Sequence, residues 1–339
     1  MSLYILKPGL LTTIQDQGRY GYQQQGVIAS GAMDSFALRA ANVLAGNEQG
    51  AAALEITLRG PSIRFEADAL IAICGGNLAP CIGAQKVPLW RSVLVRAGEA
   101  LEFGPCLSGA RTYLAVAGGI DVPLVLGSRS TYLRAGLGGF QGRALQAGDV
   151  LRCGAASGRA AAYMRNHLGA LESEPFAAAS WFIGFSSRPL YAQDPVIRFV
   201  EGRDFRHFTE ESKRAFVSRP FRVTPQSDRM GFRLEGADLR LKAPCEPISA
   251  AVSFGTVQVP PEGNPIVLMA DRQTIGGYPK IAQVASVDLP MLAQVKPGER
   301  IQFAEISLER AEELYVEAEL SFAQMEKAIG LYLMKERGV

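Results

Sequence analysis

The stretch IVLMADRQTIGGYPK, residues 266–280, combines residue types that could do chemistry. Its apolar run ends in Asp271 and Arg272, and strand ends are places where a rigid scaffold presents functional side chains. Gly276 and Gly277 let a backbone approach a ligand, and Tyr278 adds a hydroxyl and a stacking face. These residues alone allow two interpretations. One is a polar pocket, and the other is a buried Asp–Arg pair that only pins a loop.

A second stretch, TTIQDQGRYGYQQQGVIASGAMD, has similar content. It places Arg19 and Tyr22 beside glycines and ends in Ser30, Gly31 and Asp34. A glycine-rich loop is weak evidence when it stands alone, and this loop does not have the GxxxxGK[ST] pattern of a phosphate-binding loop. The stretch thus resembles residues 266–280 in content only.

A third acid–base pair, Asp228-Arg229, lies in QSDRMGFRLEG. Familiar catalytic motifs do not occur with it: the sequence has no GxSxG nucleophile elbow and no HExxH zinc site. The chemistry is therefore expected to come from Asp and Arg residues.

Length and charge limit the function classes. A chain of 339 residues suggests about two domains. No apolar run approaches the ~18 residues of a membrane helix, and the N-terminus MSLYILKPGL does not have the pattern of a signal peptide. The net charge of +2, with acids and bases interspersed, is not the charge pattern of a protein that binds nucleic acid or an anionic membrane.

Cysteine usage predicts reduced thiols in a cytoplasmic protein. The odd number of cysteines includes no CxxC pair, and the two histidines form no ligand cluster with them, which argues against zinc. These residues are Cys74, Cys81, Cys106, Cys153, Cys245, His167 and His207.

Short apolar runs alternate with Gly, Pro and Asp turns along most of the chain, which predicts a mainly β protein. Three segments share one template in which a Gly-acid turn precedes a half-buried strand: VRAGEALEF (95–103), LQAGDVLRC (145–153) and VKPGERIQF (295–303). The second and third copies close long strand-rich segments. We therefore expect β domains at 1–155 and 190–306, joined by an Ala- and Ser-rich linker at 156–189 with one short helix.

Two further helices are predicted outside the linker. FTEESKRAF (208–216) begins with the N-cap residue Thr209, followed by two glutamates that suit the positive helix start. From 307 to 337, apolar residues recur at steps of three and four, which indicates a long amphipathic helix. Its narrow stripe is expected to pack either on the chain's own β domain or on a partner protein.

Several of these segments together resemble one family. They are PGLLTTIQDQGRYGYQQQGVIASGAMD, NVLAGNEQGAAALEIT, TYLRAGLGGFQGRALQAGDVL, SDRMGFRLEG, GTVQVPPEGNPIVLMADRQTIGGYPKIA and VKPGERIQF. The chain resembles the biotin-dependent carboxyltransferase / allophanate hydrolase subunit 2 family, which includes the C subunit of 5-oxoprolinase and the KipI antagonist, which opposes a sporulation kinase inhibitor. The resemblance implies two cyclophilin-like β-barrel domains. It also implies assembly with a protein similar to the B subunit of 5-oxoprolinase (KipI-like) and with a lactam-utilisation subunit.

The resemblance implies three alternative functions. The first is a component of an ATP-dependent 5-oxoprolinase that opens a cyclic amide to glutamate, with ATP acting at the level of the complex. The second is a carboxyltransferase acting on urea or a related amide, with biotin supplied by partners because the chain has no Met-Lys-Met biotinyl sequence. The third is a non-catalytic antagonist of a sporulation kinase inhibitor.

The expected site residues follow from this interpretation. An arginine would hold a substrate carboxylate or a phosphorylated lactam oxygen, and an aspartate would act as general base. The catalytic candidates are Asp271, Arg272 and Asp34. The substrate-binding candidates are Arg19, Tyr22, Ser30, Gly31, Arg229, Gln258, Gly276, Gly277, Tyr278 and Lys280.

Overall fold

The computed structural model describes residues 1–243 and 248–334 of the chain. Contacts divide these residues into two compact units, each discontinuous in sequence. The first unit comprises 1–18, 34–189 and the described residues from 321 onward. The second unit comprises 19–33 and the described residues of 190–320. The domains expected at 1–155 and 190–306 are continuous in sequence, unlike these units, and their boundaries stay a prediction.

The first unit is built from two six-stranded sheets. One sheet has the order β11 (Val150–Arg152), β1 (Ser2–Lys7), β4 (Ser62–Phe65), β9 (Ala100–Phe103), β6 (Pro80–Ile82), β7 (Gln85–Lys86). The other has the order β12 (Phe176–Ala178), β8 (Ser92–Val95), β5 (Ala69–Asn77), β10 (Ser108–Val116), β3 (Ala53–Thr57), β2 (Leu11–Gln15). The segment expected as a linker thus supplies a strand, β12, which pairs with β8.

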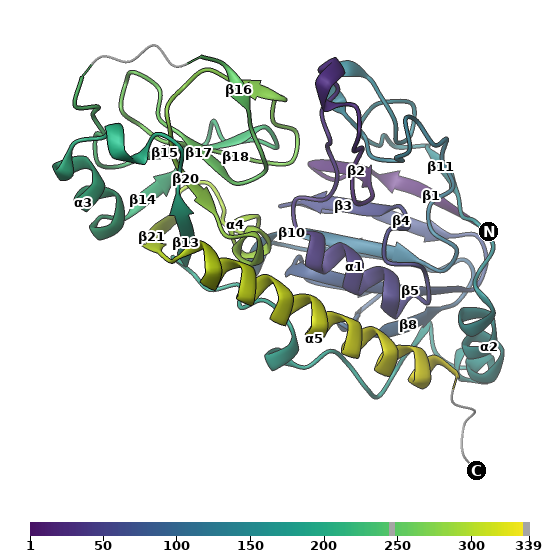
Figure 1. The fold of residues 1–339 in the computed structure, drawn as a ribbon. Helices are drawn as coiled ribbons and strands as arrows, with labels where there is room; N and C mark the ends of the chain where they lie inside the picture. The colour runs from purple at the N-terminus through teal and green to yellow at the C-terminus, as the bar shows by residue number, and fades with distance from the viewer. Residues whose placement is uncertain (244–247, 335–339) are drawn as a thin grey trace. The chain divides into compact units, whose positions relative to one another are not determined.

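Period-two alternation explains how the two sheets pack. In β5, Ile71 and Ile73 join a buried cluster that also holds Leu3 and Ile63 from the other sheet, so the two sheets share one core. The intervening β5 side chains point to the opposite face, which helix α1 (Ser35–Leu44) covers (Figure 1). The first unit is therefore layered, with a helix outside one of its two sheets.

A closed barrel forms the second unit (Figure 1). Its strand order is β13 (Val196–Glu201), β20 (Lys280–Val284), β17 (Thr256–Gln258), β18 (Ile266–Leu268), β15 (Gly231–Glu235), β14 (Phe221–Val223), β21 (Arg300–Glu305). A two-stranded ribbon pairs β16 (Ala250–Ala251) with β19 (Ile275–Gly276). Aromatic rings fill the interior: Phe216 and Phe303 stack with centroids 4.4 Å apart, and Phe199 meets Phe216 edge-on.

The repeated Gly-acid template forms the expected turn in all three places. Gly98, Gly148 and Gly298 have φ values of 85°, 91° and 94°, which favour glycine. In each copy the acidic residue that follows donates its N–H to the carbonyl three residues back, and a strand begins at or just after that residue. The turn is therefore set by local sequence.

The two helices predicted outside the linker are present. Helix α3 spans Glu210–Ser218, and the Thr209 side chain caps it by accepting a hydrogen bond from the Ser212 N–H. Helix α5 spans Leu308–Met334; residues 335–337 of the predicted helix lie outside the described residues. The remaining α-helices of the described residues are α2 (Gly158–His167) and α4 (Leu289–Leu292).

The apolar stripe of α5 is buried only in its last part, which belongs to the first unit. Phe322, Ile329 and Leu333 are buried, whereas Leu308 and Tyr315 are more than half exposed. Phe322 lies under the Arg39 guanidinium at 3.9 Å from the ring centroid, and Phe36 packs edge-on against it. This end of the helix packs on the chain's own structure, as one of the two alternatives expected.

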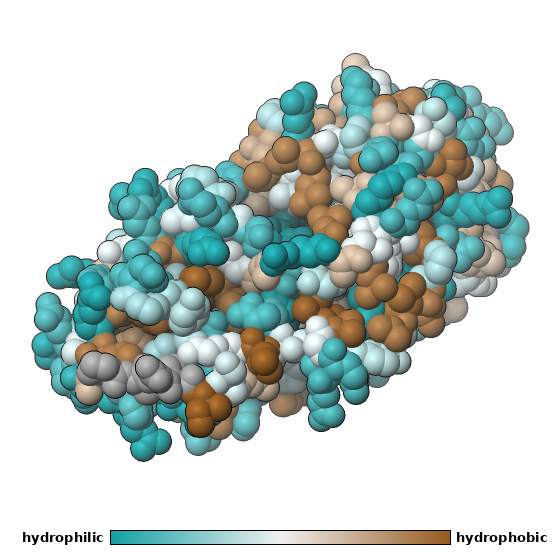
Figure 2. Space-filling view, turned by 90° about the horizontal axis from the view of Figure 1, so that it is seen from above, coloured by the Kyte–Doolittle hydropathy of each residue, from teal (hydrophilic) through white to brown (hydrophobic). Residues whose placement is uncertain are grey.

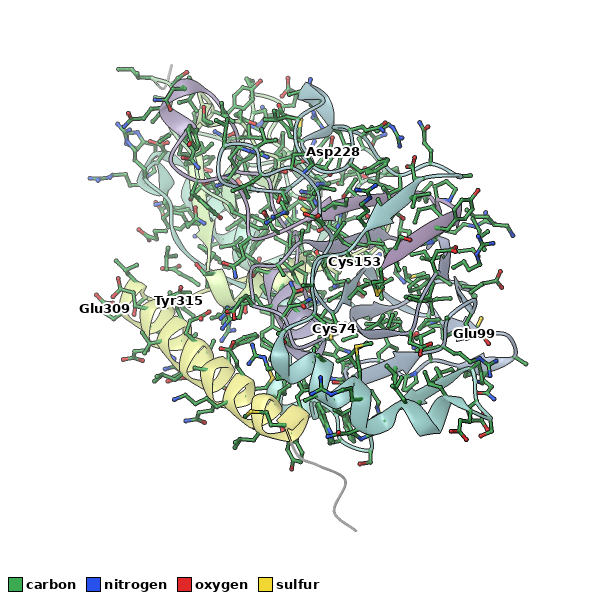
Figure 3. All side chains as sticks on the ribbon, turned by 90° about the vertical axis from the view of Figure 1, so that its right-hand side faces the viewer. Cys74, Glu99, Cys153, Asp228, Glu309 and Tyr315 are labelled. Atoms are coloured by element: carbon green, nitrogen blue, oxygen red, sulfur yellow. The ribbon has the colours of Figure 1, made fainter. Side chains whose placement is uncertain are left out.

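The mainly β class and the long terminal helix are confirmed, with one closed barrel in the second unit. Cys74, Cys81, Cys106 and Cys153 are free thiols, and Cys74 and Cys153 are buried (Figure 3). Cys245 lies outside the described residues. Over the described residues, no helix has the length and apolarity needed to cross a membrane.

Candidate functional site

The segment Arg19–Met33 closes on itself before it reaches the barrel. The Arg19 N–H donates to the Ala29 carbonyl at 2.6 Å, and Met33 joins the barrel core. Ser30 has a φ of 55° and Gly31 a φ of 92°. A left-handed serine is uncommon, so the contacts around Ser30 must hold it in place.

Asp271 makes those contacts. The Ser30 hydroxyl donates to Asp271 Oδ1 at 2.7 Å, although the two residues are 241 positions apart. Arg229 donates from Nε to Oδ2 and from one terminal nitrogen to Oδ1, each at 2.9 Å. The same terminal nitrogen donates to the Gly31 carbonyl at 2.6 Å. Asp271, which follows β18, and Arg229, which precedes β15, thus anchor the segment 19–33 to the barrel.

Burial makes this cluster rigid. The Arg229 and Asp271 side chains are only 6% and 7% exposed. A two-point guanidinium–carboxylate pair in a dry setting has a fixed geometry, and both carboxylate oxygens already accept hydrogen bonds. The general-base role expected for Asp271 stays a prediction, but this geometry favours a positioning role.

Arg272 differs from Arg229 in its surroundings. Its guanidinium makes a long 3.4 Å contact to the Met269 carbonyl and lies 5.8 Å from the Phe254 ring centroid. Its Nε is buried without a hydrogen-bond partner among the described residues. Burial lowers the pKa of the Arg272 guanidinium from its ordinary value, and the nearby charges of Tyr20 and Asp271 only partly oppose this. Arg272 therefore carries a charge that the surrounding protein compensates poorly.

Lys280 and Gln258 lie opposite each other in the β17–β20 ladder. The Lys280 side chain turns back along its own loop and donates from Nζ to the Gly276 carbonyl at 3.2 Å. Gln258 is 1% exposed and packs so tightly on Gly276 that a Cβ there would lie 2.3 Å from Gln258 Nε2. The absence of a side chain at Gly276 lets the loop and the barrel side chains meet.

The other substrate-binding candidates lie in the second unit as well. Arg19 is completely buried, whereas Tyr22 and Tyr278 are 36% and 45% exposed. Gly277 is exposed, and a Cβ there would approach the Ser249 hydroxyl at 3.1 Å. All of the substrate-binding candidates are therefore in one compact unit.

Asp34 belongs to the first unit. Its Oδ1 accepts the Ala37 N–H at 2.9 Å and so caps helix α1, and its own N–H donates to the Tyr113 hydroxyl at 2.8 Å. Tyr113 in turn donates to Glu55 at 2.6 Å. Burial raises the pKa of Tyr113 well above its ordinary value, and the charges of Glu55 and Asp34 raise it further.

Sequence reasoning missed two polar residues that organise these regions. Asp204 accepts the Lys280 N–H at 2.9 Å and so fixes the start of β20. Glu55 sits in the buried strand ALEIT, where a charged residue is rare without a partner. The signal for Glu55 was visible as a lone acid in an apolar run, whereas Asp204 looked like an ordinary turn residue.

Two surface cavities lie away from the predicted residues. One, of about 440 Å³, lies in the first unit beside the glycines of the segment 138–142, with Asp121 and Arg152 among its lining. The other, of about 510 Å³, lies in the second unit between α5 and β20. Its lining includes Tyr315, which Figure 3 labels on α5. On the face shown in Figure 2, apolar residues occur in small groups among polar ones. Within the described part of the chain, no cluster of three His, Cys, Asp or Glu residues could hold a metal ion.

Comparisons with known proteins identify a family and several relatives that this chain resembles. The family model described as carboxyltransferase domain, subdomain A and B, matches residues 25–305. The chain is 39% identical to the C subunit of 5-oxoprolinase from Haemophilus influenzae, over 94% of this chain and 95% of that protein. It is also 39% identical to the C subunit of 5-oxoprolinase from Escherichia coli, over 91% and 93%.

A solved structure shows the same fold within a larger protein. The crystal structure of Kluyveromyces lactis urea amidolyase superposes with a TM-score of 0.83 at 30% identity. The match covers 94% of this chain but only 20% of that one. The fold described above therefore recurs in a segment of a much longer chain.

Proposed function

Because the chain belongs to the family of the carboxyltransferase domain, subdomain A and B, we propose that it is the C subunit of a bacterial 5-oxoprolinase. This complex would hydrolyse the lactam 5-oxoproline to glutamate at the expense of ATP. One observation carries the proposal: the 39% identity to the C subunit of a 5-oxoprolinase extends over nearly the full length of both chains. By contrast, this chain matches only one fifth of the urea amidolyase structure.

ATP and biotin are not assigned to residues of this chain. The sequence has neither the GxxxxGK[ST] loop for a nucleotide nor the Met-Lys-Met segment for biotin. ATP, when bound by the complex, would activate the amide, whose resonance makes its carbonyl a poor electrophile. The role left to this chain is to bind and orient a small anionic substrate.

Arg272 is the residue of the 271–280 loop best suited to that role. Its guanidinium is partly buried, its Nε has no partner among the described residues, and no described carboxylate pairs with it. An anionic group of the substrate or of a reaction intermediate would supply the missing acceptor. The adjacent Asp271–Arg229 clamp would hold the loop in place for this contact.

Partners are required by this proposal. A protein similar to the B subunit of 5-oxoprolinase and a lactam-utilisation subunit would complete the complex, and the name of the bacterial relatives implies further subunits. Co-expression of this chain with the protein similar to the B subunit should give a stable hetero-oligomer on size-exclusion chromatography. Two separate peaks at micromolar concentration would contradict the assembly.

Activity of the reconstituted complex tests the reaction. The complex should convert 5-oxoproline and ATP to glutamate and ADP in bicarbonate-depleted buffer, and avidin should not inhibit it. Arg272→Gln should lower kcat/KM at least tenfold, while the exposed Arg222→Gln should leave it unchanged. Absence of glutamate formation would overturn the proposal.

The second candidate is a carboxyltransferase half-site acting on urea or a related amide. The match to the urea amidolyase structure favours it, because the whole fold of this chain recurs there. Turnover of urea but not of 5-oxoproline, together with inhibition by avidin, would move the assignment to this second function.

A further inference from the structure

We propose that Lys280 and Gln258 form a second oxyanion-binding site in the barrel, distinct from Arg272. Its ligand is a carboxylate or a phosphoryl group. The inference rests on the proposed function and identifies the residues that recognise the charged group of the substrate. Its structural basis is a pair of buried donors that converge on Gly276.

The first donor is an uncompensated ammonium group. Lys280 is 8% exposed, and buried lysines occur almost only where an anion or several acceptors surround the charge. Across the ranges 1–243 and 248–334, Lys280 Nζ makes a single hydrogen bond, to the Gly276 carbonyl, and no ion pair. An ammonium group has three N–H donors, so two remain available to a ligand.

The second donor is the side-chain amide of Gln258. Gln258 Nε2 is buried and has no hydrogen-bond partner among the residues that the structure describes. An unsatisfied buried N–H destabilises a folded protein, so such a group requires an explanation. Gln258 and Lys280 are register partners in the ladder, and both side-chain nitrogens lie next to Gly276, so we assign the two donors to one site.

The chemistry selects an oxyanion. A positive charge and a neutral N–H donor side by side match two oxygens of a carboxylate or a phosphoryl group, and a burying environment strengthens both bonds. A neutral ligand would leave the ammonium charge uncompensated. The carboxylate of 5-oxoproline and a phosphoryl group transferred in the reaction are the two sources that this chemistry allows.

Calorimetry on the isolated full-length chain separates these sources. We would titrate it with 5-oxoproline, with 2-pyrrolidinone, which has the same lactam ring but no carboxylate, and with inorganic phosphate. Binding of 5-oxoproline at least tenfold tighter than that of 2-pyrrolidinone identifies the carboxylate as the ligand. Binding of phosphate without that preference identifies the phosphoryl group. If neither anion binds, the inference is overturned.

Three variants test the residues. Lys280→Met and Gln258→Leu should each weaken anion binding, by at least tenfold and severalfold respectively. Gly276→Ala should displace the Gln258 amide and weaken binding in a folded chain, because the contact is with a flexible side chain and Gly276 has no left-handed φ. Lys296→Met is the matched control, since that lysine already pairs with Glu299 at 3.1 Å and should bind anions no differently. Unchanged affinity in folded Lys280→Met and Gly276→Ala would refute the site.

The test of the Lys280–Gln258 site can fail independently of the test of the proposed function. If the complex forms glutamate and Lys280→Met leaves KM for 5-oxoproline and anion binding unchanged, this inference fails and the function stands. If the isolated chain binds anions through Lys280 but the complex forms no glutamate, the function fails and the site stands.

Discussion

Arg229 donates two hydrogen bonds to the Asp271 carboxylate, each at 2.9 Å, and both side chains are almost completely buried. The pair also organises Ser30 and Gly31, which come from a segment about 200 to 240 positions away. Such a pair is costly to break because the remaining charge stays buried without compensation. The pair thus connects the chemistry of the candidate loop to the stability of the second unit.

Asp271→Asn should therefore destabilise the chain. Loss of the charge leaves Arg229 buried and uncompensated, and we expect the free energy of unfolding to fall by about 3–5 kcal/mol in chemical denaturation. Glu235→Gln is the control, because its pair with Arg222 is more than half exposed and should contribute about 0–1 kcal/mol. A variant of unchanged stability but without activity in the complex would instead identify Asp271 as a general base.

Asp34 should tolerate an amide. Asparagine caps a helix as well as aspartate does, so Asp34→Asn should keep stability and activity, whereas Asp34→Ala should cost about 0.5–2 kcal/mol. Thermal unfolding and glutamate formation measure the two effects. Loss of activity in a stable Asp34→Asn protein would show that Asp34 has a catalytic role in addition to capping α1.

Cys153 gives a pH-dependent prediction. Burial raises the pKa of its thiol to about 11. A pKa that is higher in the folded than in the unfolded chain gives stability that is complete below the unfolded value, near 9, and is lost as the pH rises through the folded value. Over that window the loss is about 2–3 kcal/mol.

Cys153→Ala should remove this part of the alkaline destabilisation, and alkylation of Cys153 in the native protein should stay slow until the pH exceeds about 10. Denaturation curves at several pH values and mass spectrometry of alkylated protein measure both. A wild type and a Cys153→Ala protein with the same pH dependence would show that the thiol is not protonated more tightly in the folded state.

Helix α5 can be tested in the same way at its buried end. Phe322→Ala should cost about 3–5 kcal/mol, because it removes a buried ring from between Phe36 and Arg39. Leu320→Ala, two positions away and 61% exposed, should change stability by less than about 0.5 kcal/mol. Equal effects of the two substitutions would mean that the helix does not pack on the first unit as described.

The features predictable from the sequence were those set by neighbouring residues. The Thr209 cap, the three Gly-acid turns and the periodicity of α5 depend on residues within a few positions, and the structure contains all of them. The mainly β class follows from the same local alternation. These elements require no knowledge of distant contacts.

The rest depends on contacts that no local pattern encodes. Ser30 and Asp271 meet across 241 positions, and nothing near either residue specifies the other. The sheet membership of β12 similarly depends on β8. Asp34 was grouped with the site because it ends a polar stretch, although its place before the helix SFALRAANVL is the signal of an N-cap.

The separation of Ser30 and Asp271 in the sequence also determines when their contact can form during synthesis. At about 5–20 residues per second, synthesis of the intervening chain takes roughly 12 to 48 seconds. During that interval the segment 19–33 lacks Asp271, and for most of it the segment also lacks Arg229, which lies 198 positions after Gly31. Maturation of the second unit is therefore bound to the last part of translation, and a nascent chain stalled before codon 271 carries that segment without its anchor.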